Sequence, residues 1–239
     1  MPKELIIVGT SHIAKQSSEK VRKIIDEDMP DVVGVELDLM RYKSLISKEH
    51  QKQKQGTYSS IRRVGVKGFV FASIGSFATK RLAKYVGTDP GVDMLEAVRV
   101  AHKNKIKVYL IDQNIDITLS KFSKSLTARE IGRFFLDMIK GIFNPKGELK
   151  KLGIKRFDLN TVPGEEIIEK MIAYMKKRYP SVYKVLVHQR NIVMSKRIMK
   201  LMELEDVNKM VAVVGAGHQA GMKKILEEQA NAAFTIKIT

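Results

Sequence analysis

The distribution of apolar and polar positions along the chain predicts a fold in which short buried strands alternate with helices. Short apolar runs that end at a turn residue are typical of buried strands, and apolar residues at a spacing of three and four indicate helices. The predicted strands span residues 5–8, 32–37, 108–111, 210–214 and 234–238. Helices are predicted between them, among others over residues 92–103, 165–178, 180–204 and 219–229.

The two ends of the chain repeat one plan: an apolar strand, a Gly-x-x-His segment, a helix and another strand. Strand–helix–strand units imply parallel strands, and equivalent turns of parallel strands meet at one edge of the sheet. We therefore expect an α/β fold with a mixed, largely parallel sheet and flanking helices. Residues 1–239 would form a single domain with a basic loop at about 48–67 and a helical insert at about 119–205.

The high net positive charge of the chain limits the kinds of binding partner that we expect. Its 43 Lys and Arg against 26 Asp and Glu give a formal net charge of +17, which attracts polyanions such as nucleic acid, anionic lipid or an acidic protein. The cations are spread over most predicted helices, and no basic strand carries the interleaved aromatics of an RNA-binding sheet. This argues against nucleic acid and favours solvation or an anionic membrane surface.

The sequence has no cysteine, which excludes disulfides, cysteine-zinc sites and thiol nucleophiles. No signal peptide is visible, because the N-terminus has the pattern of a strand without a charged lead-in. The apolar stretch 68–78 is about half of the ~20 residues that a spanning helix needs. It predicts either a membrane-surface helix or a partly buried one, so we expect a cytoplasmic protein or one peripheral to the membrane.

Two histidines, His12 and His218, follow predicted strands in the pattern Gly-x-x-His. Two such histidines can converge on a metal ion, or one can act as an acid or base. The alternative is that each only caps its turn by a hydrogen bond. The residues around them that we expect to contact a substrate are Gly9, Thr10, Gly215 and Gly217.

Acidic residues end two of the predicted strands. Glu36 and Asp112 stand where an unpaired carboxylate would be costly to bury. Arg190 lies in an otherwise apolar helix and should pair with one of them, unless its side chain extends to water. His188 neighbours Arg190 and is a candidate to line the same site. Asp38 has the position of a helix cap.

These segments together resemble the TraB/PrgY proteins, and most closely the archaeal group labelled as pheromone-shutdown proteins. The resemblance rests on LIIVGTSH at residues 5–12, PDVVGVELD at 30–38 and VAVVGAGH at 211–218. It implies the fold of the erythromycin-esterase-like and ChaN-like group. Relatives include the Tiki metal-dependent peptidases, which clip secreted signalling proteins, and the PrgY proteins, which reduce the output of a peptide pheromone by cleavage or sequestration.

By this resemblance, His12, His218 and Glu36 would hold a divalent transition metal (Mn, Co or Zn). From their positions at the strand ends and in the apolar helix, we expect Glu36, Asp112 and Arg190 to be the catalytic residues, acting on a peptide or protein substrate. The sequence departs from the family pattern, since amides replace expected charged residues at four positions: Gln113, Asn114, Gln189 and Asn191. Fewer carboxylates weaken the binding of a divalent cation.

Three functional hypotheses follow. The first is a metal-dependent hydrolase, in which Glu36 is a metal ligand or the general base. The second is a non-catalytic protein that binds or sequesters a peptide or another anionic ligand. The third is a protein of the membrane surface. The apolar faces of the predicted helices also allow a homodimer.

Overall fold

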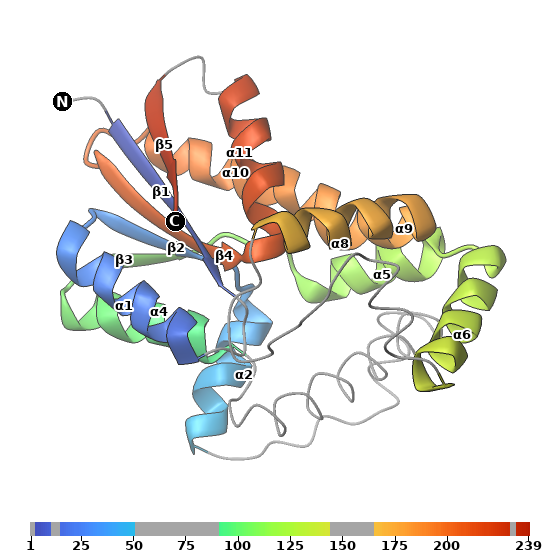
Figure 1. The fold of residues 1–239 in the computed structure, drawn as a ribbon. Helices are drawn as coiled ribbons and strands as arrows, with labels where there is room; N and C mark the ends of the chain where they lie inside the picture. The colour runs from blue at the N-terminus through green and yellow to red at the C-terminus, as the bar shows by residue number, and fades with distance from the viewer. Residues whose placement is uncertain (1–2, 11–14, 51–90, 144–164, 230–232) are drawn as a thin grey trace.

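The computed structural model describes residues 3–10, 15–50, 91–143, 165–229 and 233–239. It contains a five-stranded sheet in the order β3-β2-β4-β1-β5, and every strand pair is parallel (Figure 1). The α/β class is therefore confirmed, and the described sheet is more uniform than the mixed sheet expected. The strands are β1 (Lys3–Thr10), β2 (Val32–Val35), β3 (Lys107–Leu110), β4 (Lys209–Gly215) and β5 (Phe234–Ile238).

The two Gly-x-x-His segments follow adjacent strands. β1 and β4 lie side by side at the centre of the sheet, with Thr10 opposite Gly215. The strand–helix–strand unit at the N-terminus does form parallel strands, but β4 is inserted between β1 and β2. The carboxyl ends of β2, β3 and β4 consequently lie together at one edge.

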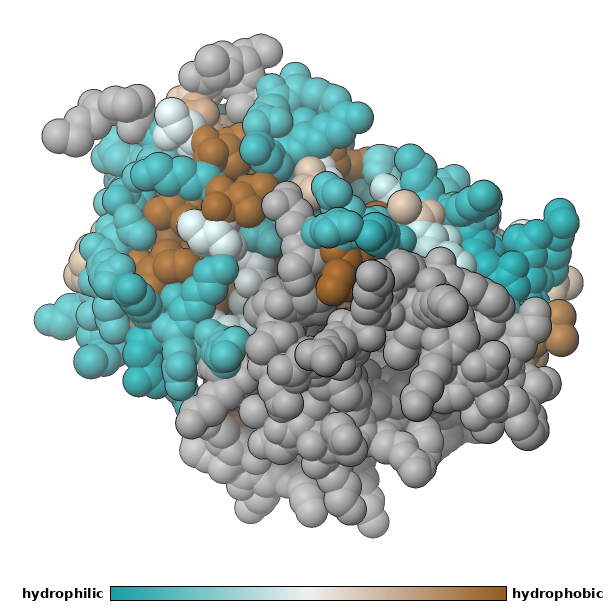
Figure 2. All heavy atoms as spheres, in the orientation of Figure 1, coloured by the Kyte–Doolittle hydropathy of each residue, from teal (hydrophilic) through white to brown (hydrophobic). Residues whose placement is uncertain are grey.

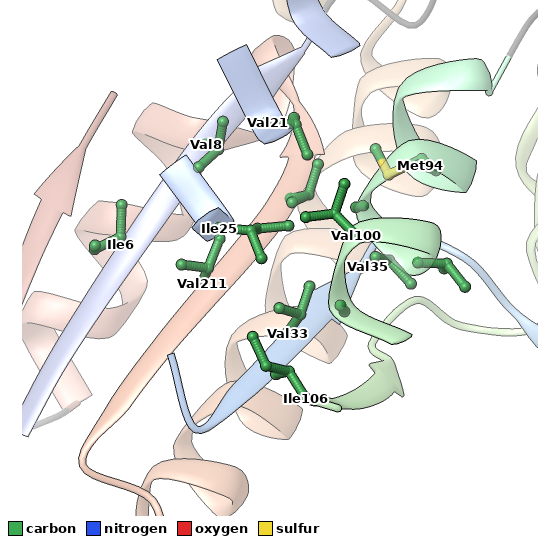
Figure 3. Close-up of a cluster of buried hydrophobic side chains, with 14 of the residues drawn as sticks. Ile6, Val8, Val21, Ile25, Val33, Val35, Met94, Val100, Ile106 and Val211 are labelled. Carbon is green, nitrogen blue, oxygen red and sulfur yellow. The ribbon is translucent and has the colours of Figure 1, made fainter. Parts of the chain in front are cut away.

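Helices cover both faces of the sheet (Figure 1). On one face, α1 (Lys15–Asp28) and α4 (Val92–Lys103) cover side chains such as Ile6 and Val8 (Figure 3). On the other, α10 (Gln189–Met202) and α11 (Ala216–Gln229) cover Leu5 and Ile7. Successive strand residues thus alternate between two apolar layers, which is why the runs in β1 and β4 are apolar throughout.

The described part of the segment between β3 and β4 consists mainly of helices. It contains α5 (Ile115–Ser125), α6 (Ala128–Phe143), α8 (Glu165–Arg178), α9 (Pro180–Tyr183), a π-helical turn (Lys184–His188) and α10. A capping box starts α6, because the Thr127 hydroxyl accepts from the Glu130 N–H and Glu130 accepts from the Thr127 N–H. The single helix predicted over residues 180–204 is instead interrupted by the π-helical turn, in which the Gln189 N–H donates to the Lys184 carbonyl.

Two predicted boundaries are wrong in a way that affects the site. The last helix was expected from residue 219, but α11 begins at Ala216, immediately after β4. His218 is therefore in the first turn of a helix and not in a loop. Strand β2 ends at Val35, so Glu36 lies just beyond it.

Several predictions fall on residues outside the described ranges. Helix α2 (Leu39–His50) includes the start of the expected basic loop, whereas residues 51–67 and the apolar stretch 68–78 are not described. None of the described helices is both long enough and apolar enough to span a membrane. On the face shown in Figure 2, hydrophilic side chains cover most of the described surface, with smaller hydrophobic patches between them.

Substitution of two neighbouring isoleucines, one in β1 and one in β5, tests where the core lies. Ile7 has no exposed surface and lies beside Ile238, which is 36% exposed. We expect Ile7→Ala to lower the free energy of unfolding by about 2–5 kcal/mol, because it leaves a cavity in a packed layer. Ile238→Ala should cost less than about 1 kcal/mol. Urea unfolding followed by circular dichroism measures both, and equal losses would contradict the assignment of the core.

Candidate functional site

Four polar side chains meet at the carboxyl edge of the sheet. Glu36 follows β2, Asp112 follows β3, His218 belongs to the first turn of α11, and Arg190 reaches them from α10. Glu36, Asp112 and His218 are 4%, 1% and 7% exposed, so all three are shielded from water. The order β3-β2-β4 makes the ends of these strands neighbours, and this brings the four side chains together.

Arg190 lies at the centre of this cluster. Its Nη2 donates to Glu36 Oε1, and also to Asp112 Oδ2 at 2.5 Å. Its Nε is 3.1 Å from both oxygens of Asp112, and its Nη1 donates to the Leu186 carbonyl at 3.2 Å. The predicted pairing of Arg190 with a carboxylate is therefore confirmed, and both candidate acids take part.

The contacts of His218 define its tautomer. Arg190 Nη1 is 3.2 Å from His218 Nε2, and a guanidinium can only donate, so Nε2 is the acceptor. The Nδ1–H then donates to Asn191 Oδ1 at 2.6 Å. Glu36 Oε1 lies 3.4 Å from the same Nε2, and Glu36 Oε2 accepts from the Gly215 N–H at 2.5 Å. His218 Nε2 thus lies between the guanidinium of Arg190 and the carboxylate of Glu36, and Nδ1 faces Asn191.

A second layer of contacts fixes the carboxylates. Arg41 donates to Asp112 Oδ2 and, at 2.7 Å, to Asp38 Oδ2. Asp38 caps α2 as predicted, since its Oδ1 accepts from the Met40 and Arg41 N–H groups. Arg197 donates to the main-chain carbonyl of Asp112. Each acid at this edge is therefore tied to a cation and to the backbone.

The electrostatics of the cluster favour a permanently charged Arg190. Burial by itself disfavours the guanidinium ion, but the carboxylates of Glu36 and Asp112 outweigh it and raise the pKa of Arg190 above its ordinary value. Arg190 consequently behaves as a fixed cation. It neutralises the acids around it over the whole physiological pH range.

The remaining predicted residues are distributed around the cluster. Thr10 is buried and its hydroxyl donates to the Val214 carbonyl at 3.4 Å. Gly9 lies against the Gln219 side chain, and Gly217 is close to Ile172 of α8. His188 is exposed and faces a neighbouring pocket. His12 lies outside the described residues.

Among the described residues, the cluster as arranged does not present a converging set of metal ligands, and the predicted ligand His12 lies outside the described ranges. A metal requires imidazole and carboxylate lone pairs that converge on one point. Here Arg190 contacts Glu36, Asp112 and His218 and takes up the lone pairs that they direct inward. Among the described residues, no group of three or more His, Cys, Asp or Glu side chains is placed to hold a metal.

Two residues of the cluster were not assigned a role from the sequence. Asn191 was noted only as an amide in place of an expected acid, yet it is 2% exposed and orients His218. Arg41 was given no role, yet it bridges Asp38 and Asp112. The spacing of Arg41 three residues after the cap Asp38 would have suggested the first contact, but nothing local indicates the second.

The fold and the cluster together define an α/β protein with an arginine-centred carboxylate site at the edge of a parallel sheet. The chain belongs to the TraB/PrgY/gumN family, whose profile it matches over residues 2–238. The family predicted from the sequence is thereby confirmed.

Relatives are found in archaea and in mammals. An uncharacterized protein of Methanocaldococcus jannaschii is 32% identical over 234 residues, which cover 95% of this chain and 54% of that protein. The TraB domain-containing proteins of Bos taurus and Homo sapiens are each 23% identical over 239 residues, covering 91% of this chain and 61% of theirs. The chain therefore spans little more than half the length of the relatives that it matches.

Removing Arg190 tests how much the cluster depends on it. We expect Arg190→Met to lower the free energy of unfolding by about 3–5 kcal/mol, because it leaves the buried carboxylate of Glu36 without its cation and that of Asp112 with Arg41 alone. The matched control is Lys107→Met, which breaks an ion pair with Asp206 whose two side chains are each 66% exposed. It should cost about 0–1 kcal/mol. Similar losses in the two variants, measured by urea unfolding, would show that Arg190 does not hold the cluster.

Proposed function

We propose that this chain binds a peptide or another anionic ligand at the carboxyl edge of its sheet without cleaving it. The observation that carries this proposal is the position of Arg190, whose guanidinium contacts Glu36, Asp112 and His218. A catalytic metal ion would have to bind the same carboxylate and imidazole atoms that Arg190 contacts. In the present arrangement Arg190 therefore competes with a metal ion for these ligands.

The same contacts disfavour Glu36 as a general base. Its Oε1 accepts from Arg190 and its Oε2 accepts from the Gly215 N–H. A general base needs a lone pair within hydrogen-bond reach of the proton that it removes.

Two features of the edge support a peptide ligand. Leu39 and Ile117 follow the ends of β2 and β3 and are 55% and 50% exposed, so they offer apolar contacts beside the cluster. In open α/β sheets this edge is where ligands bind. The net charge of +17 favours an acidic partner, because it raises the rate of encounter with anions.

The second candidate is the metal-dependent peptidase that the family resemblance implies. It is favoured by the 3.4 Å separation of His218 Nε2 and Glu36 Oε1, which places an imidazole beside a carboxylate at the expected edge. This function requires Arg190 to leave its present position. The two candidates therefore differ in what Arg190 does when metal is supplied.

Peptide binding is tested with a fluorescent acidic peptide and a basic peptide of the same length. We expect the wild type to bind the acidic peptide and leave it intact by mass spectrometry, with or without Mn²⁺, Co²⁺ or Zn²⁺. Leu39→Ser combined with Ile117→Ser should weaken binding about tenfold, because two apolar contacts of roughly 0.7 kcal/mol each are lost. Leu136→Ser, at a 56% exposed position on α6, is the control and should have no effect. Metal-dependent cleavage, or no preference between the peptides, would overturn the proposal.

Metal titration separates the two candidates at the cluster itself. We expect calorimetry to detect no stoichiometric Zn²⁺ or Mn²⁺ site in the wild type that His218→Ala abolishes. Arg190→Ala should instead gain such a site, because Glu36, Asp112 and His218 would then converge without a cation between them. Added Zn²⁺ should raise the melting temperature of Arg190→Ala and leave that of the wild type unchanged. Wild-type binding that His218→Ala removes would favour the peptidase.

A further inference from the structure

A pocket of about 530 Å³ lies on the helical side of the cluster. It is formed by α8, α9, the π-helical turn, α10 and α11, and it adjoins the cluster at the sheet edge through Asn191. The residues that define its chemistry are Lys176, Tyr183, Lys184, His188, Asn191 and Lys224. Neither the family match nor the predicted site assigns a role to this lysine pocket.

Most of the ionisable side chains that line the lysine pocket are basic. Among the described residues, three lysines and a histidine line it, and Glu228 is the one acid. Within the described part of the chain, Lys176, Lys184 and Lys224 make no ion pair. Cations that share a concave surface repel one another, and an anion bound between them relieves this repulsion.

The π-helical turn shapes one wall of the lysine pocket. Tyr183 and His188 are five residues apart, and in an α-helix such residues point about 140° away from each other. Here their rings stack, with centroids 6.3 Å apart and planes at 16°. The wider turn therefore brings two aromatic rings, and Lys184 beside them, to the same side of the helix. Such turns are frequent at functional sites.

The floor of the lysine pocket contacts the cluster. Asn191 Oδ1 contacts His218 Nδ1, so the Nδ2 amide group of Asn191 is the one that can donate to a bound anion. Gly221 makes room for this amide, because a Cβ at position 221 would collide with Asn191 Nδ2. Lys176 lies 5.8 Å above the Tyr183 ring and closes the opposite side.

We infer that the lysine pocket binds a small polyanion that carries phosphate or carboxylate groups. Lys176, Lys184 and Lys224 supply the charge, Asn191 supplies a directed donor, and the stacked Tyr183–His188 pair supplies an apolar wall for the body of the ligand. The volume is that of a site for a small molecule. This inference does not depend on whether the sheet edge binds or cleaves a peptide.

Calorimetric titration with inorganic pyrophosphate tests the inference at an ionic strength of about 0.15 M, where the Debye length is about 8 Å. We expect a one-to-one complex with the wild type. Lys184→Gln combined with Lys224→Gln should weaken it by at least about tenfold, because each change removes a charge-assisted hydrogen bond. Citrate titrated in the same way shows whether carboxylates serve as well as phosphates.

Two further variants should leave the affinity for pyrophosphate nearly unchanged or increase it. Lys223→Gln changes the same charge on the same helix but does not line the lysine pocket, so it should alter affinity less than about twofold. Glu228→Gln removes the one acid of the lining and should tighten binding. All substituted side chains are on the surface, and circular dichroism verifies that each variant is folded. No binding of pyrophosphate or citrate, or an equal loss in Lys223→Gln, would overturn the inference.

Discussion

The ion pairs between Arg190 and the carboxylates of Glu36 and Asp112 set the strictest constraint on this structure. Each of these charges is buried, and buried charges are tolerated only when their partners and hydrogen bonds are in place. Three strand ends and α10 must therefore be positioned together. The insertion of β4 beside β2 satisfies this requirement, because it brings Gly215 and His218 next to Glu36, which the N-terminal strand–helix–strand unit alone could not do.

Much of the fold follows from local sequence patterns and could be predicted. The apolar runs that became β1 and β4 are buried on both faces, and the capping box at Thr127 and Glu130 marks a helix start. The pairing of Arg190 with Glu36 and Asp112 was also predictable, since an arginine in an apolar helix needs a carboxylate. The position of β4 was not, because strand order depends on long-range contacts. The start of α11 at Ala216 was also missed, because two glycines suggested a turn.

The amides that replace expected acids fit the arginine-centred cluster. His218 Nδ1 contacts Asn191 Oδ1, and this amide oxygen accepts a hydrogen bond without bringing a further negative charge. An aspartate at position 191 would accept the same hydrogen bond, but it would add a buried carboxylate to a cluster whose acids already share Arg190. The substitution thus lowers the charge that the cluster must neutralise, and it lowers the affinity for a divalent cation at the same time.

Asn191 also connects the two regions that we consider functional. Its Oδ1 faces His218 at the sheet edge, and the same side chain lines the lysine pocket and lies against Gly221. An amide plane is rigid, so a ligand that rotates Asn191 to gain a hydrogen bond must also disturb its contact with His218. A ligand of the lysine pocket that moves Asn191 would therefore act on the geometry of the sheet edge through one side chain. By thermodynamic linkage, if a ligand of the lysine pocket changes the affinity of the sheet edge for its ligand, the ligand at the sheet edge changes the affinity of the lysine pocket by the same factor.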